Sequence, residues 1–343
     1  MSYISFQPQD YFNTVLYTGN DTDDRAITGV GFQPDLTWIK LRNLTQQHEL
    51  FDAVRGANKP ISSNATDAET TATNKLKSFD SDGFTLGTST SVNKIYNYAS
   101  WNWLANGSGS ANTDGSISST VSASTTSGFS IVTYTGTGSV GTIGHGLGTA
   151  PSVVICKQRN ATQQWINYHK AIGATKYLHL NATDASATSS TVWNDTDPTS
   201  SVFSVGTAVN CNGSGNTYVA YCFAEKKGFS KIGSYVGNGN ADGAFIYTGF
   251  KPAMVIVKCS SAGSTDWIIT DNKRGTFNPA GERLYPNLNS AEDASGDYFN
   301  YFSNGFKFNE NVNLWNTSGA TYIYMAFAEE PLVSSNGVPA VAR

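Results

Sequence analysis

The sequence has few charged residues and no long apolar run, and each absence excludes a class of protein. Lysine, arginine, aspartate and glutamate make up only 14% of the 343 residues, and the formal net charge is −4. Binding to nucleic acid or to an anionic membrane surface needs a cationic patch, which this balance does not provide. No apolar stretch approaches the roughly 18 residues of a membrane-spanning helix. We therefore expect neither nucleic acid nor membrane insertion for this chain.

Cysteine is scarce, and its spacing does not suggest a metal site. The four cysteines are Cys156, Cys211, Cys222 and Cys259, and no two of them stand in a C-x-x-C arrangement, which argues against zinc. Three of them lie in or beside apolar runs, so buried free thiols are favoured over disulfides. The acidic segment at residues 80–83 lacks the distal glutamate and the flanking helices of an EF-hand. We predict a tight turn there, and no metal or cofactor.

Signals for secretion and for common catalytic chemistry are also missing. Residues 1–6 have neither the basic start nor the apolar stretch of a signal peptide, so we expect none. No serine stands in a G-x-S-x-G context, and no glycine-rich loop leads into a helix and a lysine. We therefore propose no catalytic residue. Paired carboxylates at glycosidase spacing cannot be recognised without a fold, so that class stays open.

What the chain does contain is one block of sequence three times over. Each block opens on a tyrosine and a glycine two residues apart, and each closes on an apolar, aromatic run. Between them a proline is followed six residues later by a lysine, in the pairs Pro34 and Lys40, Pro151 and Lys157, and Pro252 and Lys258. A block of about 90 residues is long enough to enclose a small core of its own. The repeats therefore predict three domains.

The pattern within each block predicts an all-β fold. Short apolar, mostly β-branched or aromatic segments are bounded by Gly, Asn, Asp and Ser at spacings of roughly 8 to 12 residues, which is typical of a β-sandwich. No segment keeps a helical period over twelve residues, so little helix is expected. We predict three tandem β-sandwich modules, jelly-roll-like or lectin-like. The predicted organisation is an N-terminal arm at 1–11, module 1 at 12–105, a Ser/Thr/Gly linker at 106–128, module 2 at 129–227, module 3 at 228–330 and a C-terminal tail at 331–343.

One pair of charges is present or absent as a unit. Blocks one and three carry an arginine and, after an asparagine-headed turn, a glutamate, namely Arg55 with Glu69 and Arg274 with Glu292. Block two has Ile172 and Ser186 at the two places. A buried charge that loses its partner is costly, so losing both together indicates a pair within each block. We predict structural salt bridges at these positions.

Three further residues are candidates for ligand contact. Trp165 and Trp267 occupy the same place in their blocks, where block one has His48. His169 follows Trp165 by four residues, which puts both on one face of a strand. An aromatic ring beside a polar group can form a shelf on which a sugar stacks. The alternative, which we favour, is packing with one satisfied hydrogen bond.

Several strings in the sequence resemble a set of proteins encoded by aquatic tailed bacteriophages. They are residues 6–12 (FQPQDYF), 16–20 (LYTGN), 29–35 (GVGFQPD), 115–123 (GSISSTVSA), 128–132 (GFSIV) and 220–225 (AYCFAE). The resemblance implies a virion structural protein of the tail-fibre or appendage kind, made in the host cytoplasm and displayed on the particle surface. Its expected partners are other virion proteins, further copies of itself in a closed oligomer for which we expect a trimer, and a host surface glycan.

Three other functions remain open at this point. A head-decoration protein would have the same chemistry at a different place on the particle. A carbohydrate-binding module would use the tryptophans, and a polysaccharide depolymerase would use Glu69 and Glu292 as acids.

Overall fold

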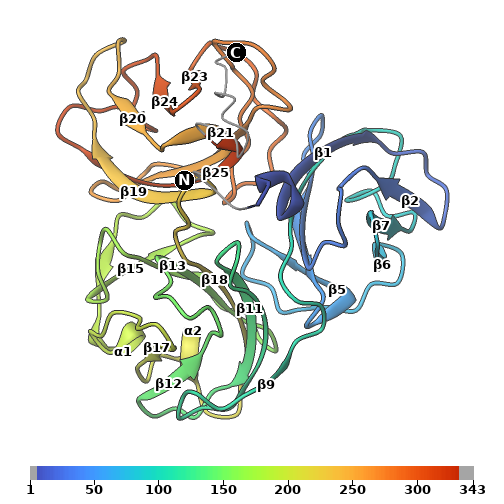
Figure 1. The fold of residues 1–343 in the computed structure, drawn as a ribbon, viewed down its shortest axis with the longest axis vertical. Coiled ribbons are helices and arrows are strands. Elements are labelled where there is room, and N and C mark those ends of the chain that lie inside the picture. The colour runs from blue at the N-terminus through green and yellow to red at the C-terminus, as the bar shows by residue number, and fades with distance from the viewer. Residues whose placement is uncertain (1–5, 332–343) are drawn as a thin grey trace.

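The computed structural model describes residues 6–331, and its regular structure is almost entirely β (Figure 1). About 43% of the chain is strand and 3% is helix, in several separate antiparallel sheets. The predicted all-β class is confirmed. Among residues 6–331 no helix is long and apolar enough to cross a membrane.

Module 1 is a sandwich of two antiparallel sheets. The larger has the order β1-β8-β3-β4-β5 and the smaller the order β2-β7-β6. The strands are β1 (Phe12–Thr18), β2 (Arg25–Thr28), β3 (Leu36–Leu41), β4 (His48–Asp52), β5 (Gly56–Ser62), β6 (Leu76–Asp80), β7 (Gly83–Leu86) and β8 (Asn97–Trp103), after a short 3-10 turn η1 (Pro8–Asp10).

The larger sheet of module 2 repeats this order as β11-β18-β13-β14-β15. Strand β16 extends it beyond β15, and β10 and β9 extend it beyond β11. The smaller sheet is β12-β17. The elements are β9 (Ser110–Asn112), β10 (Ser119–Ser124), β11 (Phe129–Thr135), β12 (Gly141–Gly144), β13 (Val153–Gln158), β14 (Ile166–His169), β15 (Lys176–His179), β16 (Ala187–Thr188), α1 (Ser190–Trp193), β17 (Val202–Val205), α2 (Val209–Asn212) and β18 (Thr217–Phe223).

Module 3 has the same plan, with a larger sheet β19-β25-β21-β22 and a smaller sheet β20-β24-β23. Its strands are β19 (Ser230–Val236), β20 (Phe245–Tyr247), β21 (Phe250–Cys259), β22 (Ile268–Asp271), β23 (Phe299–Phe302), β24 (Gly305–Phe308) and β25 (Thr321–Pro331). In every module the closing strand lies between the opening strand and the strand that follows or, in module 3, contains the repeat proline.

The strand after the proline is buried on both faces, and this decides how the modules assemble. In β3 all six residues are buried. Ile39 and Leu41 face the smaller sheet and join the core of module 1, whereas Leu36 and Trp38 point the other way. Because successive side chains of a strand alternate between its two faces, each larger sheet needs a second covering layer. The other two modules provide it.

The largest hydrophobic cluster is therefore shared by all three modules. Each sandwich has its own core between its two sheets, but one further cluster takes residues from β1, β3 and β8, from β11, β13 and β18, and from β19, β21 and β25. Figure 1 shows the three modules as three lobes around this centre, module 1 in blue, module 2 in green and module 3 in yellow to red. The expectation that each copy encloses only its own interior is corrected in this respect.

Three aromatic rings mark the centre. Trp103, Phe223 and Phe327 are equivalent residues of the three closing strands, and all are buried. Their ring centroids are 6.1, 5.7 and 5.6 Å apart, a nearly equilateral triangle. The three modules are thus related by an approximate threefold axis within one chain.

The predicted linker at 106–128 is instead part of a sheet. Its residues form β9 and β10, and β10 pairs with β11 from Ser119 opposite Tyr134 to Ser124 opposite Phe129. Ile117 and Val121 enter the core of module 2. The Ser/Thr/Gly-rich composition misled the prediction because strand pairing uses backbone groups, which every residue but proline provides in full.

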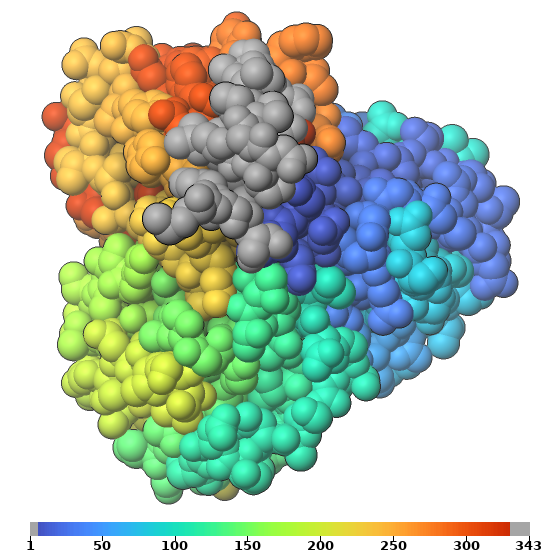
Figure 2. Space-filling view, viewed as in Figure 1, coloured from blue at the N-terminus to red at the C-terminus, as the bar shows by residue number. Residues whose placement is uncertain are grey.

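The described part of the predicted arm packs on the body. The Phe6 ring contacts Tyr11 and Phe229, at centroid distances of 5.0 and 5.6 Å. The dark-blue N-terminal segment lies near the middle of the face shown in Figure 2, where the three modules meet. Residues 1–5, and the predicted tail beyond residue 331, lie outside the described residues.

Candidate functional site

All seven residues singled out by the sequence lie where two modules meet. We call the three contacts seam 1/2, seam 2/3 and seam 3/1, after the modules they join. The seams are equivalent around the threefold axis, so each sequence difference between them can be compared directly.

Seam 1/2 is built around a fully buried guanidinium. Arg55 Nε lies 2.5 Å from Asp52 Oδ2, and its Nη1 lies 3.0 Å from Glu69 Oε2. Arg159 of module 2 binds the same glutamate, with Nε at 2.9 Å from Oε2 and Nη2 at 3.0 Å from Oε1. The hydroxyl of Tyr221 donates to Asp52 at 2.7 Å. The pair predicted within one block is thus also a bridge between two modules.

Seam 3/1 repeats the arrangement. Arg274 lies 2.6 Å from Asp271 and 2.9 Å from Glu292. Arg42 of module 1 binds Glu292 with Nη2 at 2.7 Å from Oε1 and Nε at 3.0 Å from Oε2. Trp101 Nε1 donates to Asp271 at 3.0 Å, as Tyr221 does in seam 1/2. Arg42 and Arg159, which sequence reasoning missed, each stand two residues after the repeat lysine.

Seam 2/3 has lost the whole network while keeping its backbone. Ile172, Ser186 and Ser260 replace the two arginines and the glutamate. The Ser186 N–H still donates to the carbonyl of Ser260 at 2.9 Å, as Glu69 does to Arg159 at 2.7 Å. The two arginines and the glutamate are thus absent together, as expected if a charge without its partner is costly in a largely buried place.

The charges at the seams shift the pKa values of the groups that carry them. Burial acts to lower the pKa of Arg55, but Asp52, Tyr221 and Glu69 raise it above its ordinary value. Burial acts to raise the pKa of Glu69, and the two arginines outweigh it, so that this pKa is lowered. Both groups are charged at neutral pH, which suits an ion pair and not a general acid.

The three repeat lysines close the same ring of contacts. Lys157 Nζ donates to the carbonyl of Thr66 at 3.1 Å, and Lys258 Nζ to that of Thr183 at 3.1 Å, each in the preceding module. Lys40 Nζ lies 3.5 Å from the carbonyl of Asn289 in module 3. Burial lowers the pKa of each lysine to about 8. The invariant spacing from proline to lysine thus places one ammonium group at each seam.

The two candidate sugar-binding tryptophans are seam residues too. Trp165 is 0% and Trp267 4% exposed. Trp165 Nε1 donates to the carbonyl of Ser62, and Trp267 Nε1 to that of His179, both at 2.9 Å and both in the preceding module. Neither ring offers a face to solvent, so the sugar-shelf interpretation is corrected in favour of packing with one satisfied hydrogen bond.

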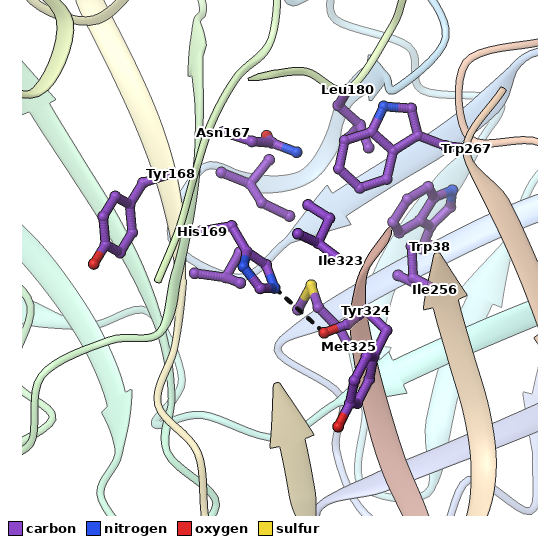
Figure 3. Close-up of a pocket in the computed structure, with 12 residues that line it drawn as sticks. Trp38, Asn167, Tyr168, His169, Leu180, Ile256, Trp267, Ile323, Tyr324 and Met325 are labelled. Carbon is purple, nitrogen blue, oxygen red and sulfur yellow. Dashed lines mark hydrogen bonds between the residues drawn. The ribbon is translucent and has the colours of Figure 1, made fainter. Parts of the chain in front are cut away.

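His169 occupies the place that Asp52 and Asp271 have in the other seams, and it is also buried. Figure 3 shows its ring directed at module 3, where Nε2 lies 3.3 Å from the carbonyl of Tyr324. Its Nδ1 accepts the N–H of Ala171 at 3.1 Å. One nitrogen donates and the other accepts, which requires the neutral ring. Met325 stands where Trp101 and Tyr221 donate to an aspartate in the other seams, and it has no donor to offer.

We expect acid to weaken the fold as pH falls from about 6.5 to about 4. Burial lowers the pKa of His169 to about 4, whereas an unfolded histidine titrates near 6.5. The unfolded chain therefore binds more protons in this window, and the stabilisation present above pH 6.5 is lost through it, by about 3 kcal/mol at pH 4 from this residue. Burial also lowers the pKa of His48 and His145.

Thermal unfolding of His169→Gln across pH 4 to 7 should give a flatter profile of stability against pH than wild type. His179→Gln, at a partly exposed histidine, is the control; parallel profiles for His169→Gln and wild type would contradict the assignment.

The four cysteines are buried and unpaired. Burial raises the pKa of Cys156 to about 12 and raises that of Cys222 as well, so these thiols are unreactive. Among residues 6–331, no group of three or more His, Cys, Asp or Glu side chains is placed to hold a metal ion.

Two polar hollows open at the surface of the molecule. One, of about 290 Å³, is lined by Ser118, Ser119, Thr120, Thr133, Tyr134, Thr135, Arg159 and Thr217. The other, of about 550 Å³, lies on module 1 between residues 46–49, 74–75 and 88–94. Neither contains a residue that the sequence analysis proposed for a ligand.

One family profile covers the sequence from residue 7 to residue 331, across all three modules and the strands between them. The chain belongs to the family described as domain of unknown function DUF7483. Neither the curated proteins nor the solved structures give a match to it. The DUF7483 unit is thus the complete three-module body, as expected if the modules cannot be separated without exposing the shared core.

Proposed function

We propose that the protein is a non-enzymatic structural component of a bacteriophage particle, of the tail-fibre or appendage kind, displayed at the particle surface. The proposal is supported by the buried ion pairs at the places where modules meet. Two ion pairs within modules, Arg55 with Asp52 and Arg274 with Asp271, have 0% exposed side chains. Tyr221 and Trp101 of the neighbouring modules donate to their two aspartates and so tie the pairs to the seams. A rigid unit is what a fibre or appendage requires.

The threefold plan also suits this role. Closed symmetric assemblies are the usual outcome for structural subunits. Here one chain supplies three equivalent modules around an axis, so it can sit on a threefold position of a particle as a single copy. The expected trimer of whole chains stays a prediction, and light scattering tests it against the mass of one chain, 36.7 kDa.

Gold-labelled antibodies against the chain, imaged on purified particles, test the proposal. We expect label on the tail or on appendages, with densitometry of particle proteins giving tens of copies. Label over the head at a copy number near that of the major capsid protein would instead establish a decoration protein. Particles that carry no label would overturn the virion assignment.

A further inference from the structure

The larger polar hollow lies open at the surface of module 1. Its volume of about 550 Å³ is within the range of small-molecule sites. Strand β4 and the turn before it contribute Gln46, Gln47 and Glu49 to one side, and Thr88, Ser89, Thr90 and Ser91 form a run of hydroxyl groups on another. Asn74, Lys75 and Lys94 complete the lining.

Comparison of the three modules singles out Glu49. The equivalent residues are Ile166 and Ile268, and both are buried in the cores of their own modules. Trp193 joins the same core as Ile166, and Trp315 the same core as Ile268. Module 1 therefore has a carboxylate at the edge of an open hollow where its two sister modules have an isoleucine side chain in an apolar core. The difference is confined to this module, so a general requirement of the fold does not explain it.

The carboxylate of Glu49 is only half satisfied. Its side chain is 2% exposed, and Oε1 lies 2.5 Å from Lys75 Nζ. Oε2 is buried and has no hydrogen-bond partner among the described residues. A buried acceptor without a donor destabilises the fold, and more so when it is charged. Such a cost is explained if a ligand supplies the donor, with the 22% exposed Lys75 side chain moving to admit it.

The charges around the hollow define which ligand fits. Lys75 is paired with Glu49, and Lys94 is paired with Asp21 at 2.5 Å. An anionic ligand would face Glu49, and a cationic one would face two ammonium groups. The remaining lining consists of hydroxyl and amide groups, which both donate and accept. A neutral molecule with several neighbouring hydroxyl groups matches this mixture.

We propose that the hollow of module 1 binds a neutral sugar residue, one hydroxyl of which donates to Glu49 Oε2. The assignment of this sugar to a host surface glycan rests on the proposed function, whereas the binding of a sugar to the hollow does not. The two can fail separately, because the particle-labelling experiment uses no sugar and the binding experiment uses no particles.

Saturation-transfer NMR on the full chain tests the site, with glucose, galactose, mannose, rhamnose and N-acetylglucosamine as probes. We expect saturation transfer to at least one of these sugars at about 10 mM. This concentration is tenfold above the Kd of about 1 mM that we expect for a single sugar residue. Glucuronate and glucosamine, which carry a charge, should bind more weakly than their neutral parents. Transfer to none of the neutral sugars, or stronger binding of either charged one, would overturn the proposal.

Two variants locate the binding. Glu49→Ile installs the residue of modules 2 and 3 and should weaken binding about tenfold or more, since one charge-assisted hydrogen bond contributes about 1.5 to 3 kcal/mol. Thr88→Val/Thr90→Val removes two hydroxyl groups at nearly constant shape and should weaken binding too, which keeps the test decisive if Glu49→Ile folds poorly. The matched control is Thr120→Val/Thr133→Val, the same change in the smaller hollow. Binding that is lost in the control, or kept in both module 1 variants, refutes the assignment.

Discussion

Replacing Arg55 with methionine is expected to lower the free energy of unfolding by about 3 to 5 kcal/mol, the range found when a buried ion pair loses one partner. The guanidinium donates to Asp52, to Glu69 and, at 3.1 Å, to the carbonyl of Leu50. All of these groups remain buried in the variant, and methionine gives them no donor. Chemical denaturation followed by fluorescence measures the loss.

The sister module provides the matched control for this variant. Ile172 is the equivalent residue, so Ile172→Met makes the same side chain in a seam without the arginine–glutamate network and should cost less than about 1.5 kcal/mol. The double variant Asp52→Asn/Arg55→Met should be at least as stable as Arg55→Met, because it removes the stranded carboxylate. A loss below about 1 kcal/mol for Arg55→Met, the range of surface pairs, would show that the network is not buried as described.

The charge network was only half visible in the sequence. Arg55 and Glu69 were paired because block two lacks both of their counterparts. Arg159 was missed because its glutamate belongs to a different block. The signal was present nevertheless. The arginine two residues after the repeat lysine is present in block two and absent from block three, which has Ser260 at this position. An arginine that disappears one block after its glutamate indicates contact between each block and the next, and so a closed ring.

The shared core was hidden for a similar reason. All six residues of β3 are buried, so this strand is covered on both faces. A sandwich of two sheets covers only one face of each sheet. The second cover, which comes from the other modules, could have been inferred from Leu36 and Trp38, but nothing in their spacing says which surface covers them. The spacing of apolar residues identifies a buried face but does not identify the surface that covers it.

The two interpretations of the tryptophans stayed open, and the hollow was not found, because sequence pattern does not report depth. Trp165 and Trp267 each follow a polar residue, Gln164 and Asp266, yet both rings are buried and their indole N–H groups donate to carbonyl groups of the preceding module. Glu49 attracted no attention because a single carboxylate in a strand has no motif. Alignment with Ile166 and Ile268 would have marked it, since a charge at a core position needs a reason.

Replacing Trp103 with alanine is expected to destabilise all three modules at once. The indole is 1% exposed and packs against Phe223 and Phe327 at the threefold axis. Truncation of a buried tryptophan costs about 3 to 5 kcal/mol because a cavity replaces its contacts. If the modules share this core, they unfold in a single cooperative transition, and the variant lowers the free energy of that transition. Amide exchange should then become faster in the smaller sheets of modules 1, 2 and 3 alike.

The comparison that decides this point is Phe84→Ala, in the core that belongs to module 1 alone. Phe84 is 0% exposed and lies on β7, away from the axis. Its truncation should cost a similar free energy, but exchange should rise first in the smaller sheet of module 1, because local openings need not break the shared core. If Trp103→Ala also speeds exchange in module 1 only, the three modules fold independently and the axis is a surface contact. Equal loss of protection in β7, β17 and β24 after Trp103→Ala would instead establish that the three modules share one cooperative core.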